Sequence, residues 1–207
     1  RWKFIHIPPG GKKWVKETFS KEGRMILGKL SIVFLFVAMF WALFDQTGST
    51  WVFQAREMDR TIFGVELLES QIQAVNPILI LTLIPIFYYG IYPCMNKYVF
   101  EMTPMRRIAI GFFVAIPAFA LTAITQDTID QIAINGGPAP SIGWQMLSYL
   151  IITVAEILIS ITCLEFAYTQ APKTMKSIVM GCYLASVSIG NAVTAGVIYF
   201  NENADGT

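Results

Sequence analysis

Charged residues, histidine and catalytic motifs are all scarce in this sequence, and each scarcity excludes a class of protein. Only 14% of the 207 residues are charged and the formal net charge is +1, so no basic stripe for nucleic acid is expected. The single histidine, His6, lies near the start of the chain, and neither HExxH nor GxSxG occurs. We therefore expect no enzyme, no metal site, no cofactor and no nucleic-acid partner.

Cysteine is equally scarce. Cys94, Cys163 and Cys182 lie far apart, in or beside apolar runs. This distribution fits neither a disulfide framework nor a zinc site. We interpret the three cysteines as small buried hydrophobic residues.

Apolar residues are abundant, at 55% of the chain, and the mean hydropathy is +0.55. A helix that crosses a bilayer needs roughly 20 mainly apolar residues. Five runs of that kind occur, at approximately 30–50, 76–95, 108–125, 144–167 and 177–200. The loops between them are too short to hold another domain. We therefore predict an all-α, multi-pass protein whose main partner is the lipid bilayer.

Lysine and arginine are distributed unevenly between the two sides of these spans. When the loops are assigned alternately to the two sides, one side has only Arg56 and Arg60, and the other has the remaining basic residues. Because basic loops stay cytoplasmic, we predict a cytoplasmic N-terminus and an extracytoplasmic C-terminus. Residues 1–29 become a cytoplasmic basic linker, residues 30–200 the membrane bundle and residues 201–207 an extracytoplasmic tail.

Glu156 is the most informative ionisable residue inside a predicted span. It lies 12 residues after Trp144, which places it about 18 Å into the span at 1.5 Å per residue, near the bilayer centre. Ser160 follows four residues later and shares its helical face. Such a carboxyl group could carry a proton or bind an ammonium group. A structural hydrogen bond between helices is the alternative.

Asp45 is the second such residue, with Trp41 four positions before it on the same helical stripe. That stripe should face a cavity, although Trp41 could also be an ordinary packing aromatic. No lysine or arginine lies within a predicted span, and an unpaired charge in lipid is costly. We therefore expect the cationic partner of Asp45 outside this chain. Asn76, at the entrance of the second span, could project into water or simply cap its helix.

Three segments of the sequence resemble the proton-dependent oligopeptide transporter (POT/PTR) family. They are FWALFDQTGSTWVFQA at 40–55, the stretch at 144–177, and SIGNAV at 188–193. The resemblance covers about 29–200 and makes the five spans look like spans seven to eleven. It implies most of the C-terminal bundle of a major facilitator fold, with the N-terminal bundle as the missing partner. The chain, which starts at Arg1 without the family's N-terminal signature, looks like a fragment.

The resemblance also implies roles for individual residues. Trp41 matches a cavity-lining tryptophan, and Asp45 matches the acid that pairs with an arginine of the N-terminal bundle. Glu156 matches the glutamate that recognises the peptide's amino terminus and couples to protonation. Three further residues are implied at the peptide site: Ser160 beside Glu156, Asn76 as a peptide-contacting asparagine, and Tyr183 where many relatives have tryptophan.

The implied function is symport of di- and tripeptides with protons as the coupling ion, by alternating access. Two alternatives stay open: a non-transporting receptor or scaffold that keeps a transporter's cavity, and a family member that carries nitrate or another solute. Animal relatives carry a large extracellular domain where this sequence has a short loop, 126–143. We therefore predict a bacterial inner membrane protein.

Overall fold

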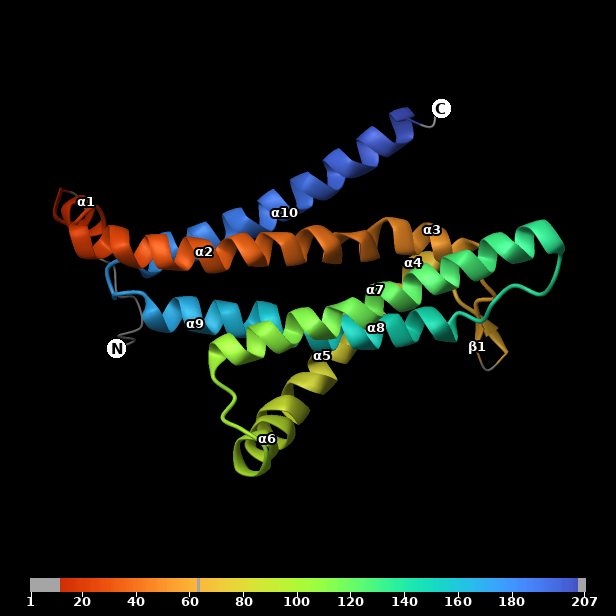
Figure 1. The fold of residues 1–207 in the computed structure, drawn as a ribbon, viewed down its shortest axis with the longest axis horizontal. Helices are drawn as coiled ribbons and strands as arrows, with labels where there is room; N and C mark the ends of the chain where they lie inside the picture. Colours follow the sequence, from red (N-terminus) through yellow and green to blue (C-terminus); the bar gives the residue numbers. More distant parts are fainter. Residues whose placement is uncertain (1–11, 63, 205–207) are drawn as a thin grey trace, which may run out of the picture. The chain divides into compact units, whose positions relative to one another are not determined.

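The computed structural model describes residues 12–62 and 64–204, which are almost entirely helical (Figure 1). Within these residues, five helical runs are long and apolar enough to cross a membrane: Lys21–Arg56, Glu69–Tyr98, Pro104–Asn135, Gly143–Gln170 and Lys176–Phe200. Each run contains one of the predicted apolar ranges. The prediction of an all-α protein with five spans is therefore confirmed. His6, together with the rest of 1–11 at the start of the predicted linker, and 205–207 at the end of the predicted tail lie outside the described residues.

The first two spans are each built from several elements. The first follows the short helix α1 (Lys12–Thr18) and consists of α2 (Lys21–Phe44), the 3₁₀ helix η1 (Asp45–Gly48) and α3 (Thr50–Arg56). A hairpin of β1 (Thr61–Ile62) and β2 (Val65–Glu66) leads to α4 (Glu69–Ile72), α5 (Val75–Ile86), the π-helix η2 (Phe87–Ile91) and α6 (Tyr92–Tyr98). The third span is the single helix α7 (Pro104–Asn135).

The fourth span contains α8 (Gly143–Glu156), the π-helix η3 (Ile157–Ile161) and α9 (Thr162–Gln170), and the fifth is α10 (Lys176–Ala204). Spans one, two and four are thus interrupted by a non-α turn. In the second span, Pro85 lies inside α5 just before the π turn, where its missing N–H leaves a carbonyl without its helical donor. Pro117 in α7, by contrast, is accommodated within one continuous helix.

The loop predicted at 126–143 is shorter than expected, because α7 continues to Asn135. Polar residues extend this helix past the apolar run through bonds between side chains four residues apart. Gln126 donates to Asp130 at 3.0 Å, and Gln131 donates to Asp127 at 2.9 Å. Hydropathy marks only the part of a helix that crosses lipid, so it missed this extension.

The end of the predicted linker is also helical, because α2 starts at Lys21. Ser20 precedes this helix, and its hydroxyl accepts a 3.1 Å hydrogen bond from the Gly23 N–H, as an N-cap does. The interpretation of all cysteines as buried is wrong for Cys94, which is exposed, whereas Cys163 is buried. Cys94 belongs to the second span. Only 11% of the most apolar part of this span is buried within the chain.

Packing divides the chain into two compact units: unit 1, formed by 1–43 and 163–207, and unit 2, formed by 44–162. In unit 1, α10 packs against α2 through a stripe of small residues. A Cβ atom at Gly190 would lie 2.5 Å from the Ala38 carbonyl oxygen and 2.8 Å from the Trp41 Cβ, so only glycine permits this approach. One turn further, the Thr194 hydroxyl donates to the Ala42 carbonyl at 2.5 Å.

In unit 2, α7 and α8 run side by side (Figure 1). Gly111 allows the close approach, since a Cβ atom there would lie 2.5 Å from Ile159 Cγ1. Trp51 is almost fully buried and stacks edge-on against Tyr149 and Phe119, with ring centroids 5.0 and 5.9 Å away. This aromatic cluster holds α3, α7 and α8 together.

Candidate functional site

Glu156 lies at the end of α8 and is only 8% exposed. Asn76, near the start of α5, donates through Nδ2 to Glu156 Oε2 at 2.9 Å and to Thr153 Oγ1 at 3.0 Å. The Thr153 hydroxyl in turn donates to the backbone carbonyl of Tyr149 at 2.6 Å. One face of α8 and the start of α5 therefore hold the carboxylate in a defined position.

This arrangement argues against Asn76 as a helix cap. The residue that precedes α5 as its N-cap is Ala74, and the cap makes no side-chain hydrogen bond. The Asn76 amide bonds another helix and does not cap its own. Its two N–H donors are both used, one on the carboxylate and one on the threonine hydroxyl.

A π turn begins directly after Glu156. It covers Ile157–Ile161 and contains Ser160, which is 8% exposed and thus as buried as Glu156. Turns of this type inside α-helices are rare and occur often at functional sites. Ser160 and Glu156 therefore stay together in the interior of the chain, but on a locally widened helix that the four-residue spacing did not predict.

The charges near this site are few. Among the residues whose side chains the structure describes, ion pairs join Arg56 and Arg60 to Glu66 and Glu69, at 2.7–3.1 Å. None of these described pairs involves Glu156 or Asp45. A neutral amide is thus the donor that holds the Glu156 carboxylate, which leaves its charge to be met by a proton or by a cation from elsewhere.

Asp45 opens the 3₁₀ helix η1 and is half-buried. Ser49, between η1 and α3, has φ −124° and ψ −86°, outside the α region, so the regular helix is broken there. Asp45, Asn76, Glu156 and Ser160 all belong to unit 2. The structure brings Asn76 and Glu156 into direct contact, and it sets Asp45 on the broken segment of the first span.

Trp41 and Tyr183 belong to unit 1. Trp41 is partly exposed on α2, with its ring edge-on to Phe40 at 6.1 Å between centroids. Tyr183 is 5% exposed on α10 and packs edge-on against Phe34 at 6.0 Å. Tyr183 is thus a packed aromatic residue of unit 1, whereas Trp41 keeps an accessible face.

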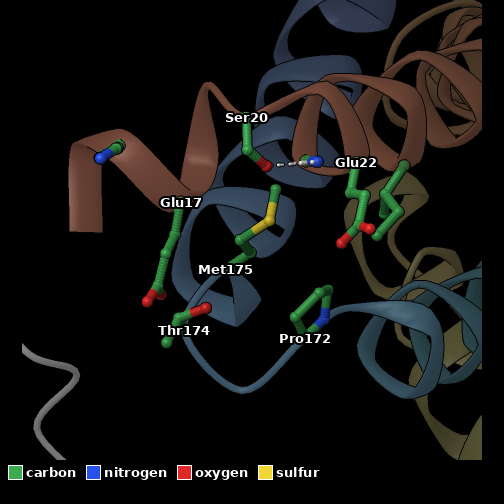
Figure 2. Close-up of a pocket in the computed structure, with 9 residues that line it drawn as sticks. Glu17, Ser20, Glu22, Pro172, Thr174 and Met175 are labelled. Atoms are coloured by element: carbon green, nitrogen blue, oxygen red, sulfur yellow. Dashed lines mark hydrogen bonds between the residues drawn. The ribbon is translucent and has the colours of Figure 1, made fainter. Parts of the chain in front are cut away.

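A cavity of about 590 Å³ lies in unit 1, and none of the predicted site residues lines it. It is bounded by α1, the start of α2 and the loop before α10. Figure 2 shows the carboxylates of Glu17 and Glu22 on either side of this hollow, with Met175 between them and Thr174 beside Glu17. Its lining contains acidic and hydroxyl groups from segments that the sequence assigned to the linker and to a loop.

A family model, PTR2, described as POT family, matches residues 7–206. The chain belongs to the POT family. Its fold is similar to the crystal structure of the POT family transporter PepTSo, with a TM-score of 0.69 and 36% identity over 82% of this chain and 32% of that one. It is also similar to an auto-inhibited POT family peptide transporter, with a TM-score of 0.70 and 38% identity.

Relatives of this POT-family chain include Peptide transporter 3 of Caenorhabditis elegans, 38% identical over 49% of this chain and 14% of the relative. Solute carrier family 15 member 1 of Homo sapiens is 38% identical over 57% of this chain and 17% of the relative. The chain thus spans about a sixth of the length of these relatives. The predicted fold class is confirmed, most of the C-terminal bundle of a major facilitator fold, and so is the prediction that the chain is not an enzyme.

The predicted site of this POT-family chain omitted two residues that contact its centre. Thr153 bonds Asn76, and Tyr149 accepts the Thr153 hydrogen bond. A signal for both was present, since positions 149, 153 and 156 repeat at helical spacing on the face of Glu156. Hydroxyl residues in apolar runs often bond their own helix, so spacing alone did not single them out.

Proposed function

We propose that the protein to which this chain belongs is a proton-coupled symporter of di- and tripeptides. This proposal is supported by the family, by relatives named as peptide transporters, and above all by one observation. Glu156 is buried in the middle of a span and held by the Asn76 amide, without a lysine or arginine partner among the described residues. A carboxyl group in that setting is suited to bind a proton or an ammonium group.

The mechanism follows from competition at one group. The amino terminus of a peptide presents three N–H donors and a positive charge, and an ionised carboxylate in low-dielectric surroundings is its strongest acceptor. A proton on the same carboxylate removes that charge. When the ammonium group displaces the proton from Glu156, the proton passes to an acceptor in the N-terminal bundle, and both the proton and the peptide leave on the other side of the membrane as the bundles change conformation. Protons serve in this way as the coupling ion. Asn76 keeps the carboxylate aimed while this happens.

The other predicted residues receive roles around this centre. Ser160 adds a hydroxyl beside Glu156, and Trp41 contributes aromatic wall to the peptide cavity. Tyr183, which is 5% exposed and packs on Phe34, stays a prediction for the same wall. Asp45 pairs with a cationic residue of the N-terminal bundle, and breaking this pair accompanies opening on the outer side. In this scheme the peptide bridges both bundles, and alternating access moves the bundles around it.

The same proposal includes the place of the protein in the cell. The N-terminus is cytoplasmic and the C-terminus extracytoplasmic, as the distribution of lysine and arginine indicates. A bacterial inner membrane stays a prediction from the short segment between the third and fourth spans, because the relatives named above come from animals.

The decisive experiment is uptake of a labelled dipeptide into proteoliposomes that contain the complete transporter. Glu156→Gln, which keeps the shape and removes the charge, should abolish accumulation driven by a proton gradient. The matched control is Glu165→Gln, an exposed carboxylate in the same span, which should accumulate peptide normally. Normal proton-driven accumulation by Glu156→Gln would rule out the assigned role.

The same vesicles separate the alternatives. Peptide binding without proton uptake would identify a receptor, and nitrate-driven proton uptake without a response to peptide would identify a carrier of another solute. Proton uptake that follows added dipeptide supports symport.

A further inference from the structure

Two side chains of the fourth span donate hydrogen bonds to the broken region of the first span. The Tyr149 hydroxyl donates to the Thr47 carbonyl at 2.9 Å, and Gln145 Nε2 donates to the Trp51 carbonyl at 2.6 Å. The donors are four residues apart on α8, and the acceptors are four apart on either side of Ser49, where the helix is broken. Both donors are at most 2% exposed. The Thr47 carbonyl lies in the last turn of η1, where carbonyls lack a partner in the helix, and the Trp51 carbonyl, at the start of α3, receives a second donor from α8.

Tyr149 also contacts the site of Glu156 through its other end. Its backbone carbonyl accepts a hydrogen bond from the Thr153 hydroxyl. The same hydroxyl accepts a hydrogen bond from the Asn76 amide, which also donates to Glu156. Each step is a hydrogen bond of 2.6–3.0 Å within unit 2. The Tyr149 ring is fixed between these ends by edge-on packing against Trp51, 5.0 Å between centroids. A shift of the Tyr149 ring would disturb its bond to Thr47, and a shift of its backbone would disturb the bond from Thr153.

The acceptor segment is the part of the first span best suited to have two arrangements. A short 3₁₀ stretch within a longer helix often marks a hinge, because it can convert to α geometry by exchanging hydrogen bonds. This one, η1, begins with Asp45. Contact between two sites does not by itself establish coupling. Coupling requires an element with two conformations whose equilibrium both sites shift.

We propose that Tyr149 is a positioning residue that couples the occupancy of Glu156 to the conformation of η1, and thereby to the placement of Asp45. The proposal rests on the function proposed above. When Glu156 takes up a proton or an ammonium group, its bond with Asn76 changes, and Thr153 and Tyr149 follow. The hydroxyl of Tyr149 then holds or releases the Thr47 carbonyl. Gln145 stabilises the same segment from one turn further along.

The test is Tyr149→Phe in the complete transporter, because this change keeps the ring packing and removes only the hydroxyl. A hydrogen bond of ordinary strength implies that the maximal rate of proton-driven dipeptide uptake falls about two- to tenfold. The KM for peptide should stay within about twofold, since the change removes only the bond to Thr47 and leaves the bond from Thr153 to the Tyr149 backbone carbonyl in place. The control is Ser148→Ala, a neighbouring buried hydroxyl whose bond goes to Trp144 of its own helix, and it should transport normally.

Two further measurements distinguish positioning from a purely structural role. In a double variant with Asp45→Asn, the loss should be no larger than that of the worse single variant, whereas independent effects would multiply. A cysteine placed at the exposed Thr50 should react several times faster with a soluble maleimide in the Tyr149→Phe background. Gln145→Met removes the second donor. It should show the same non-multiplying loss with Asp45→Asn and the same faster labelling at Thr50, and it replaces Tyr149→Phe in the test if that variant does not reach the membrane.

The labelling measurement does not depend on transport. If the unmodified protein moves no peptide but Tyr149→Phe still accelerates labelling at Thr50, the proposed function fails and the positioning role stands. If labelling is unchanged, or if the losses of the double variant multiply, the coupling proposal is overturned while proton-driven peptide uptake by the unmodified protein is unaffected.

Discussion

At the scale of single residues, the hydrogen bond between Asn76 and Glu156 is the centre of the proposed site. A carboxylate buried in a span is costly unless its oxygens accept hydrogen bonds. The Asn76 amide supplies one such bond at 2.9 Å without neutralising the charge. A lysine in its place would hold the carboxylate more tightly but would also occupy the position that a proton or ammonium group needs.

We predict that Asn76→Leu weakens peptide binding more than it slows the transport cycle. A hydrogen bond to a charged group contributes about 1.5–3 kcal/mol, so the KM of the complete transporter for a dipeptide should rise about tenfold or more. Initial uptake rates at several peptide concentrations measure this change. Thr82→Val is the control, because Thr82 is exposed on the same helix and bonds its own backbone carbonyls. An unchanged KM for Asn76→Leu would contradict the assignment.

At the scale of helices, two kinds of local feature shape the spans. Non-α turns interrupt three of the spans, at Asp45–Gly48, Phe87–Ile91 and Ile157–Ile161. Small residues set the distances between helices, at Gly111 in unit 2 and at Gly190 in unit 1. The non-α turns allow the helices to bend, and the glycines allow neighbouring helices to pack closely.

Gly190→Val should therefore destabilise the protein. The added side chain would be forced against the Ala38 carbonyl and Trp41, and overpacking of this kind costs about 1–3 kcal/mol. Gly181→Val on the same helix serves as the control, since a Cβ atom at Gly181 meets no atom within 4 Å. Thermal unfolding of the purified transporter in detergent should show a lower midpoint for the first variant only. Equal midpoints would indicate that α2 and α10 pack less closely.

At the scale of the whole molecule, the basic residues bias one side of the membrane. Lys97, Arg106 and Arg107 cluster around the turn between the second and third spans, whereas Arg56 and Arg60 lie between the first and second. The latter two are neutralised by Glu66 and Glu69. The net basic charge thus concentrates at one end of the spans, which the positive-inside rule assigns to the cytoplasm.

Cysteine labelling in intact cells should report this orientation. In a transporter whose native cysteines are replaced, Ser141→Cys should react with a membrane-impermeant maleimide added outside. Thr103→Cys should react only after the cells are opened. Both positions lie in turns between spans, so one serves as the control for the other. The reverse pattern would invert the proposed topology.

The sequence by itself determined the number of spans and the class of fold, and it predicted Glu156 as a site residue. Hydropathy and charge are properties of local composition, and a bilayer imposes a fixed length on every span. What the tertiary structure alone decided is which polar groups meet. Asn76 and Glu156 lie 80 positions apart, and Tyr149 reaches Thr47 across 102. Such pairs depend on how the helices pack and on the π and 3₁₀ turns within them. These features arise from contacts between helices and produce no periodic pattern in the sequence.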